Sequence, residues 1–198
     1  MKKKKKLVVF LALSTLIALT AVTLAFFTAK DSVTNKFTIG NLTIKVDEPG
    51  WKDKDSWTGE KVQKIARVTN TDTFPAIIRV AVEPRWEDPN GGFFGGNISL
   101  LNIEYSNITK DYTTTNSWYD GGDGYYYYTT IVQPGEATED IIKSIEFNVP
   151  EDQKDKYDEK KLKAVVRAEA VFPKAGTFAD SWSGLHDDVK KMLTDLSK

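Results

Sequence analysis

The sequence LKAVVRAEAVF, residues 162–172, alternates between two kinds of side chain. Arg167 and Glu169 stand at odd-numbered positions, where a charge is tolerated only at a surface. A period of two is typical of a β-strand with one buried face, so we predict such a strand here. The positions that share the apolar face are Leu162, Ala164, Val166, Ala168, Ala170 and Phe172.

Further segments of the same kind precede this strand, and they are short, rich in β-branched or aromatic residues, and separated by turn formers. No helical segment alternates with them, which argues against a parallel βαβ fold. We therefore predict an all-β fold, an antiparallel sandwich of jelly-roll type. The predicted strands are residues 36–46, 61–70, 76–84, 99–105, 125–132 and 142–149.

Only the end of the chain has the period of a helix. Apolar residues recur at spacings of three and four, which predicts one amphipathic helix at the C-terminus. Thr177, with Asp180 three residues later, predicts the cap of a short helical turn before it. The apolar residues of the terminal helix are Leu185, Val189, Met192, Leu193 and Leu196.

The N-terminus has the composition of an export signal. Five lysines at positions 2–6 precede an uncharged apolar segment, 7–25, which we predict to be a signal helix. Thr23 and Ala25 place small residues three and one positions before a cut, so cleavage is expected in front of Phe26. A retained anchor is the alternative, since about 20 apolar residues also span a bilayer. Either way the folded part is expected outside the cytoplasm, as a secreted protein.

Charge and cysteine content restrict the class of protein. The signal holds five of the 27 Lys and Arg residues and none of the 28 Asp and Glu residues, so the rest of the chain has a net charge of about −6. Nucleic acid is therefore not an expected partner, because phosphate binding needs clustered positive charge. The chain has no Cys, so packing alone must hold the fold. The 173 residues after the signal suffice for one domain.

Signatures of catalysis are missing from the sequence. The single histidine, His186, and the lack of Cys exclude His/Cys zinc clusters and cysteine nucleophiles. No phosphate-binding loop of the G-x-x-x-x-G-K type occurs. A glycosidase built on two carboxylates stays open, because any two of the acidic residues can meet in a fold. We expect neither an enzyme nor a cofactor.

Two features suggest a binding module as the alternative. Asp111, Asp120 and Asp123 are weak candidates for Ca²⁺ ligands, although their spacing does not match an EF-hand loop. The aromatic residues at 118–119 and 125–128 are candidates for a sugar-stacking surface. Alternation within a strand sends two of the four tyrosines at 125–128 to each face, so some must lie outside the core or under another element.

The segment behind the cut forms a candidate donor arm, 26–36. Phe27, Ala29 and Val33 lie on one phase of an extended chain that begins at Phe26. Such an arm can pair with its own sheet, remain outside the domain, or add as a strand to another copy. Head-to-tail addition generates filaments unless the rotation closes. The folded domain is then residues 37–198.

Four blocks of the sequence resemble a known family. They are LAFFTAKDSVTNKFTIGNLTIKVDEPGW (24–51), VTNTDTFPAIIRVAVEPRW (68–86), IVQPGEATEDIIKSIEF (131–147) and AVVRAEAVFPKAGTFADSW (164–182). In this order they are similar to the TasA/camelysin group of exported matrix proteins, most closely to the BsaA-type biofilm matrix proteins that a SipW-type signal peptidase processes. Members have been labelled metallopeptidases, but this chain supplies no ligand set for that activity.

The resemblance implies a jelly-roll subunit that self-associates into extracellular fibres. A SipW-type signal peptidase would remove the signal, and the arm from Phe26, including Phe27, Ala29 and Val33, would be donated to the next subunit. Contact with the membrane would be limited to the uncleaved signal. The terminal helix extends beyond Trp182, where the family's domain closes, so both a main and an accessory fibre subunit are compatible with the sequence.

Overall fold

The structure is a computed structural model, and it describes residues 42–49 and 61–198. The chain divides into two compact units, 1–34 and 35–198, and the described residues all belong to the second. The predicted signal peptide, its cleavage site and the donor arm lie outside the described residues, as does most of the strand predicted at 36–46.

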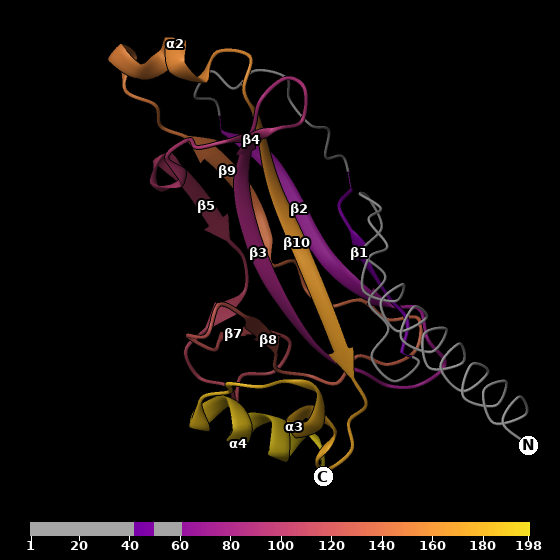
Figure 1. The fold of residues 1–198 in the computed structure, drawn as a ribbon. Helices are drawn as coiled ribbons and strands as arrows, with labels where there is room; N and C mark the ends of the chain where they lie inside the picture. Colours follow the sequence, from indigo (N-terminus) through magenta and orange to yellow (C-terminus); the bar gives the residue numbers. More distant parts are fainter. Residues whose placement is uncertain (1–41, 50–60) are drawn as a thin grey trace, which may run out of the picture. The chain divides into compact units, whose positions relative to one another are not determined.

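The first sheet has four strands, all paired antiparallel. Strand β1 lies at one edge and β5 at the other, with β2 and β9 between them (Figure 1). In sheet order, the strands are β1 (Ile44–Asp47), β2 (Val62–Asn70), β9 (Ile142–Phe147) and β5 (Leu101–Tyr105).

The second sheet is built on a long antiparallel pair, β3 and β10, which align over eleven residue pairs. A short strand, β4, pairs with the end of β3. Strands β6 and β7 pair in parallel, an exception to the predicted antiparallel pattern. In sheet order, the strands are β10 (Lys161–Val171), β3 (Ile77–Glu87), β8 (Tyr126–Tyr128), β7 (Trp118–Asp120) and β6 (Ile108–Thr109), with β4 (Phe93–Phe94) beside β3.

After β2 the chain passes back and forth between the sheets, through β3, β5, the segment β6–β8, β9 and β10 in turn, and side chains from both sheets form one buried core. The prediction of a mostly β chain is confirmed. Strand β10 follows the predicted alternation, because its even-numbered residues are buried and its flanking charges lie on the other face. The core residues from the first sheet include Ile44, Ala66, Val68, Ile142 and Ile145, and those from the second include Ile78, Val80, Val166 and Ala168.

Two helices cover part of the outer face of the second sheet. Helix α3 spans Thr177–Ser181 and α4 spans Asp187–Leu196 (Figure 1). A second core joins them to outward residues of the sheet, among them Ile77, Tyr127 and Val171. The predicted terminal helix is confirmed, because it buries the apolar face that its sequence period indicates. The helix residues of this core, with those beside them, are Phe178, Trp182, Leu185, Val189, Met192 and Leu193.

Several local predictions are wrong. Helix α3 has Gly176 as its N-cap and no side-chain cap, so Thr177 does not cap it. The charged segment 151–161, which lies outside the one helix predicted at the C-terminus, forms a 3-10 turn at Glu151–Gln153 and the helix α2 at Lys154–Tyr157. The Tyr157 ring at the end of α2 is buried against Trp86 and Phe147. No helix within the described ranges is long and apolar enough to cross a membrane.

The strand predicted at 125–132 is shorter than expected. Strand β8 ends at Tyr128, and beyond it only a single bridge, between Val132 and Ala76, continues the pairing. The strand predicted at 99–105 begins instead with a 3-10 turn at Ile98–Leu100. Turn and bend residues replace ladder pairing in both places, although the side chains have high β propensity.

Candidate functional site

Strand β1 is the point where the N-terminal part of the chain joins the described domain. Among the described strands it is the end strand of the first sheet, and it lies next to β10, the end strand of the second. The first described residues, Leu42 and Thr43, therefore lie at a side of the domain where both sheets end among the described strands. We call this place, made of Thr43, Asn70, Asp72 and Phe74, the arm junction.

Asp72 fixes the start of the arm junction through backbone hydrogen bonds. Its carboxylate accepts from the backbone N–H groups of Thr43 (2.9 Å), Thr73 (2.7 Å) and Phe74 (3.2 Å). Partial desolvation raises the pKa of Asp72, but these donors outweigh it, so the pKa lies below its ordinary value. Asp72 therefore ties the segment before β1 to the turn between β2 and β3.

Asn70 is the buried polar residue behind this turn. Its side-chain amide donates to the carbonyl oxygens of Phe74 (2.8 Å) and Val132 (2.9 Å), and its Oδ1 accepts from the N–H of Asp72 (3.0 Å). All these partners are backbone groups of two loops. Asn70 thus holds the arm junction against the segment that leads to β9. The sequence gives a signal for it, because Asn-Thr-Asp-Thr between two strands is typical of a side-chain-stabilised turn.

Lys64 is another buried polar residue near β1, and its burial was not predicted from the sequence. It lies on the inward face of β2, with 1% of its side chain exposed, and its Nζ is 2.8 Å from Oε1 of Glu48. Glu48 follows β1 directly. The pair therefore joins the other end of β1 to β2, and the only sequence signal is a lysine on the apolar phase of a strand.

The aromatic residues proposed for sugar stacking lie mostly inside the protein. Tyr126 and Tyr128 face the core between the sheets, where Tyr128 packs on Trp118 with ring centres 5.0 Å apart. Tyr127 faces the opposite side and packs under the C-terminal helices, while Tyr125 lies partly buried against the same cluster. The predicted split of the tyrosines between two faces is confirmed, and the outer pair lies under another element.

Arg79 organises a polar cluster beneath the helices. Its Nε and Nη2 donate to one carboxylate oxygen of Glu169 at 3.0 and 2.7 Å, and its Nη1 donates to the Tyr127 hydroxyl at 3.2 Å. The Tyr127 hydroxyl donates in turn to Asp123 at 2.6 Å. Burial raises the pKa of Tyr127, so this hydroxyl stays protonated. Every group of the cluster has a partner within the cluster, which is typical of a structural network.

The three candidate calcium ligands lie in separate turns. Asp111 accepts from the N–H and hydroxyl of Thr113, and Asp120 accepts from the N–H of Gly122. Asp123 accepts from the N–H of Tyr125 as well as from the tyrosine hydroxyl named above. Within 42–49 and 61–198, no three acidic or histidine residues are grouped as a metal site requires. The structure therefore does not bring this candidate set together.

His186, the single histidine, is the N-cap residue of α4. It is exposed and extended in backbone conformation, and its side chain makes no capping hydrogen bond. Its ring lies beside Gly122 in the turn between β7 and β8. No base, acid or nucleophile role follows from this position.

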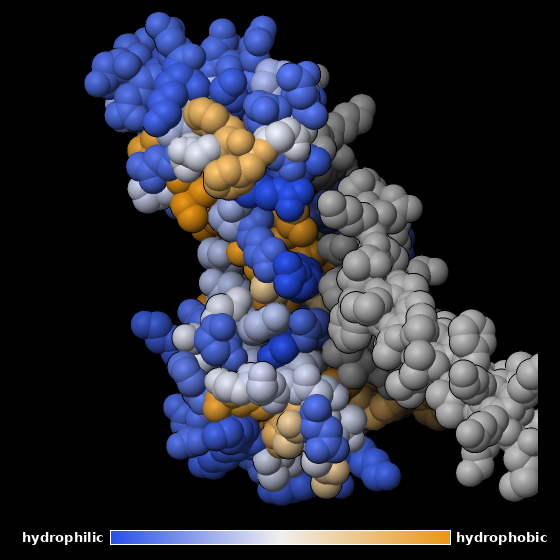
Figure 2. Space-filling view, in the orientation of Figure 1, coloured by the Kyte–Doolittle hydropathy of each residue, from blue (hydrophilic) through white to orange (hydrophobic). Residues whose placement is uncertain are grey.

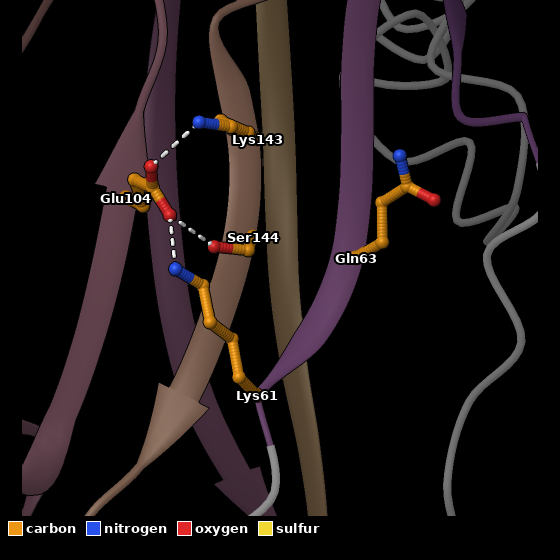
Figure 3. A pocket seen from close by; sticks show the side chains of 5 residues that line it. All are labelled: Lys61, Gln63, Glu104, Lys143 and Ser144. Carbon is orange, nitrogen blue, oxygen red and sulfur yellow. Dashed lines mark hydrogen bonds and ion pairs between the residues drawn. The ribbon is translucent and has the colours of Figure 1, made fainter.

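A shallow depression of about 330 Å³ lies on the outer face of the first sheet (Figure 3). Lys61, Lys143 and Ser144 all point toward Glu104, whereas Gln63 points away. The carboxylate of Glu104 lies 2.6 Å from Nζ of Lys61 and 3.0 Å from Nζ of Lys143, and it accepts from the Ser144 hydroxyl at 2.7 Å.

The charges of this depression compensate one another. Hydrogen bonds from Lys61, then from Ser144 and Lys143, lower the pKa of Glu104 to about 2. A carboxylate of that pKa is a poor base for a serine hydroxyl at neutral pH, because general-base catalysis is most efficient near the operating pH. The residues therefore form a surface ion-pair network, and their geometry offers no activated nucleophile.

Comparison with protein-family models, with curated proteins and with solved structures finds no match to this chain. The family resemblance of the four sequence blocks is thus an expectation from the residues alone. The position of β1 at the end of the first sheet, beside β10 of the second, is the feature of the described domain that bears most directly on this resemblance.

Proposed function

We propose that this chain is a structural subunit of extracellular biofilm fibres. After removal of the signal, the arm at 26–36 adds as a strand to the next copy, and repetition of that contact extends the fibre. The chain acts as a secreted, non-enzymatic protein whose principal partner is another copy of itself.

The observation that carries this proposal is the place of β1. Strand β1, which the arm precedes in the sequence, is an end strand of the first sheet among the described strands, and it lies next to β10, an end strand of the second. Sheet edges are where an added strand finds backbone partners. The edge position of β1 among the described strands therefore supports strand exchange at this side.

The strand order supports a jelly-roll architecture. The sets β2-β9-β5 and β3-β8-β7 come from alternate passes of the chain between two sheets. Wrapping of this kind is the basis of jelly-roll sandwiches. On this proposal β1 and β10 are additions at one side of the jelly roll, next to the arm.

The test uses the mature chain, beginning at Phe26, and a deletion of residues 26–33. Electron microscopy is expected to show filaments of the first protein, and sedimentation to show folded monomers of the second. Two single substitutions test whether the apolar phase of the arm matters. Phe27→Asp lies on that phase, and Thr28→Asp lies on the opposite phase. Phe27→Asp should block assembly while Thr28→Asp retains most of it. Assembly of the deleted chain at the rate of the intact one would overturn the proposal.

A further inference from the structure

The connection between β3 and β4 contains an Asn-Gly step, Asn90–Gly91. Asn90 is the only asparagine of the chain that glycine follows. Both residues are exposed, at the end of the domain where Figure 1 places β4. Figure 2 shows hydrophilic surface beside a hydrophobic patch at this end. The step is therefore open to water and to hydroxide.

The step lies in a tight turn that Asp88 organises. The N–H of Gly91 donates to the carbonyl oxygen of Asp88 at 3.0 Å, which closes a β-turn with Pro89 at its second position. The Asp88 carboxylate accepts from the N–H groups of Asn90 (2.9 Å) and Gly92 (2.8 Å). All these contacts use the backbone of residues 90–92. The side-chain amide of Asn90 makes no hydrogen bond to another residue of the described ranges.

A free amide beside glycine is open to attack by the backbone. The nitrogen of Gly91 bonds to Cγ of Asn90 and closes a five-membered imide ring, while the bond from Cγ to Nδ2 breaks. Ammonia leaves with the proton of the Gly91 N–H. Glycine has no β-carbon to shield its nitrogen, and the space beside Gly91 is open, because an added β-carbon would meet no atom within 4 Å. Water then opens the ring at either carbonyl, which gives an aspartyl or an isoaspartyl residue.

One hydrogen bond opposes the attack. The carbonyl of Asp88 holds the N–H of Gly91, so the turn must open before this nitrogen reaches Asn90. Strand β4 has only two residues and aligns with β3 at two positions. Such short pairings at the end of a sheet open at low free energy. The reaction therefore needs local opening of the turn and not unfolding of the domain.

Asn116 provides the comparison within the same chain. It is exposed, as Asn90 is, but Ser117 follows it. The β-carbon of Ser117 hinders attack by its nitrogen, and its N–H donates to the hydroxyl of Thr129 at 3.1 Å. Asn116 is therefore expected to keep its amide longer than Asn90.

The two Asp-Gly steps of the next hairpin, 120–121 and 123–124, are also better protected. The N–H of Gly121 donates to the carbonyl of Tyr125 at 3.0 Å. The Asp123 carboxylate accepts from the N–H of Tyr125 (3.0 Å) and from the hydroxyl of Tyr127 (2.6 Å). An ionised carboxylate is also a poorer electrophile than an amide. These steps are therefore not expected to react before Asn90.

We propose that Asn90 is a site of spontaneous deamidation and that its isoaspartyl product releases β4 from β3. The isoaspartyl link runs through the side chain and adds one C–C bond, about 1.5 Å, to the backbone. The N–H groups of Gly91 and Gly92 then no longer meet the oxygens of Asp88. Among the described strands β4 pairs only with β3, so the loss of this turn frees it, and the ring of Phe94 leaves Tyr157. This chemistry is independent of assembly.

Ageing of the purified full chain tests the first step. The protein is kept in warm, mildly alkaline buffer, and digestion with mass spectrometry locates each lost amide. Loss at Asn90 is expected to be roughly tenfold or more faster than at Asn116, because no β-carbon hinders the nitrogen of Gly91. A protein isoaspartyl methyltransferase with labelled S-adenosylmethionine should label the aged parent. It should leave Asn90→Gln unlabelled, because the longer side chain has to close a six-membered ring. Loss at Asn90 no faster than at Asn116, or equal labelling of Asn90→Gln, overturns the proposal.

Hydrogen exchange at Phe94, the residue paired with Trp86, tests the second step. Freshly prepared Asn90→Asp carries the new charge on a backbone of ordinary length and should exchange as slowly as the parent. The isoaspartyl form, separated from aged parent by chromatography, should exchange at Phe94 roughly tenfold faster or more. Repeated methylation by the same enzyme, which returns isoaspartyl to aspartyl residues, should restore slow exchange. Equal exchange in the isoaspartyl form and in Asn90→Asp overturns the release of β4.

Discussion

The guanidinium carbon of Arg79 lies 4.5 Å from the ring centre of Trp182, the residue that follows α3. The same guanidinium carbon also lies 3.8 Å from the ring centre of Tyr125. A cation held against two aromatic rings in a site that excludes water is a strong interaction. Arg79 therefore links β3 to the C-terminal helices, and the stability of the helical cover depends on it.

We expect Arg79→Ala to lower the free energy of unfolding by about 3–5 kcal/mol, because it leaves the mostly buried carboxylate of Glu169 without its cationic partner and with only the Tyr125 hydroxyl as a donor. Urea denaturation measures the change, and hydrogen exchange should show faster exchange in α4. The matched control is Arg167→Ala. Arg167 pairs with Glu83, and both are largely exposed, so its loss should cost about 0–1 kcal/mol. Equal costs for the two variants would contradict a special role of Arg79.

The strand pattern of residues 76–84 places Arg79 on the face opposite Ile78 and Val80, and the structure agrees. The pattern does not predict that the C-terminal helices cover that face. Helix α3 reaches it from about one hundred residues later in the chain, so its position depends on tertiary packing rather than on any local period. The buried ion pair with Glu169 could not be predicted for the same reason.

Asn70 provides a test of the arm junction. Asn70→Ala removes three hydrogen bonds to backbone groups and should lower the free energy of unfolding by about 1–3 kcal/mol. Asn70→Asp should cost more, although it keeps the size, because a carboxylate then faces the carbonyl oxygens of Phe74 and Val132. Thermal unfolding checks the order of the two variants. An Asp variant as stable as the parent would show that these hydrogen bonds do not hold the junction.

The sequence predicts part of this site and omits part. The run from Asn70 to Pro75 has the composition of a turn, and the chain bends at 72–74 between β2 and β3. The partners of Asn70 include Val132, which is 62 positions away, and no local spacing reveals such a contact. Lys64 illustrates the same limit, because a lysine on the apolar phase of β2 becomes intelligible only when Glu48 is placed beside it.

Helix α4 allows a test of whether the C-terminal cover belongs to the cooperative fold. Leu193 is fully buried against the second core, so Leu193→Ala should cost about 2–5 kcal/mol. Thr194→Ala, at the next and exposed position, should change stability by no more than about 0.5 kcal/mol. Calorimetry should give one transition for both variants. A separate early transition that only Leu193→Ala shifts would mean that the helix unfolds independently of the sheets.

The Glu104 cluster predicts a pH dependence. The folded-state pKa of Glu104 is lowered to about 2, so the stabilisation it provides is complete above the ordinary carboxyl pKa of about 4.5 and is lost as the pH falls toward 2. We expect Glu104→Gln to be less stable than the parent at neutral pH. The two stability curves should converge between about pH 4.5 and 2. Urea denaturation at a series of pH values measures the difference.

Lys61→Gln tests whether the contact with Lys61 causes the low pKa of Glu104. Lys61 makes the largest contribution to the lowered pKa of Glu104, so its removal should move that pKa upward, toward the ordinary value. The pH window of acid destabilisation should then end at a higher pH than in the parent, because its upper limit stays at the ordinary carboxyl pKa of about 4.5. Carbon NMR of the Glu104 carboxyl group follows the titration directly.

Salt should also raise the pKa of Glu104 in the parent toward its ordinary value. Lys61 and Lys143 are exposed, and at about 1 M salt the Debye length falls to about 3 Å, so the attraction of both lysines is screened. An unchanged Glu104 titration in Lys61→Gln would contradict the ion pair as its cause, and would leave the Ser144 hydrogen bond as the main source of the low pKa.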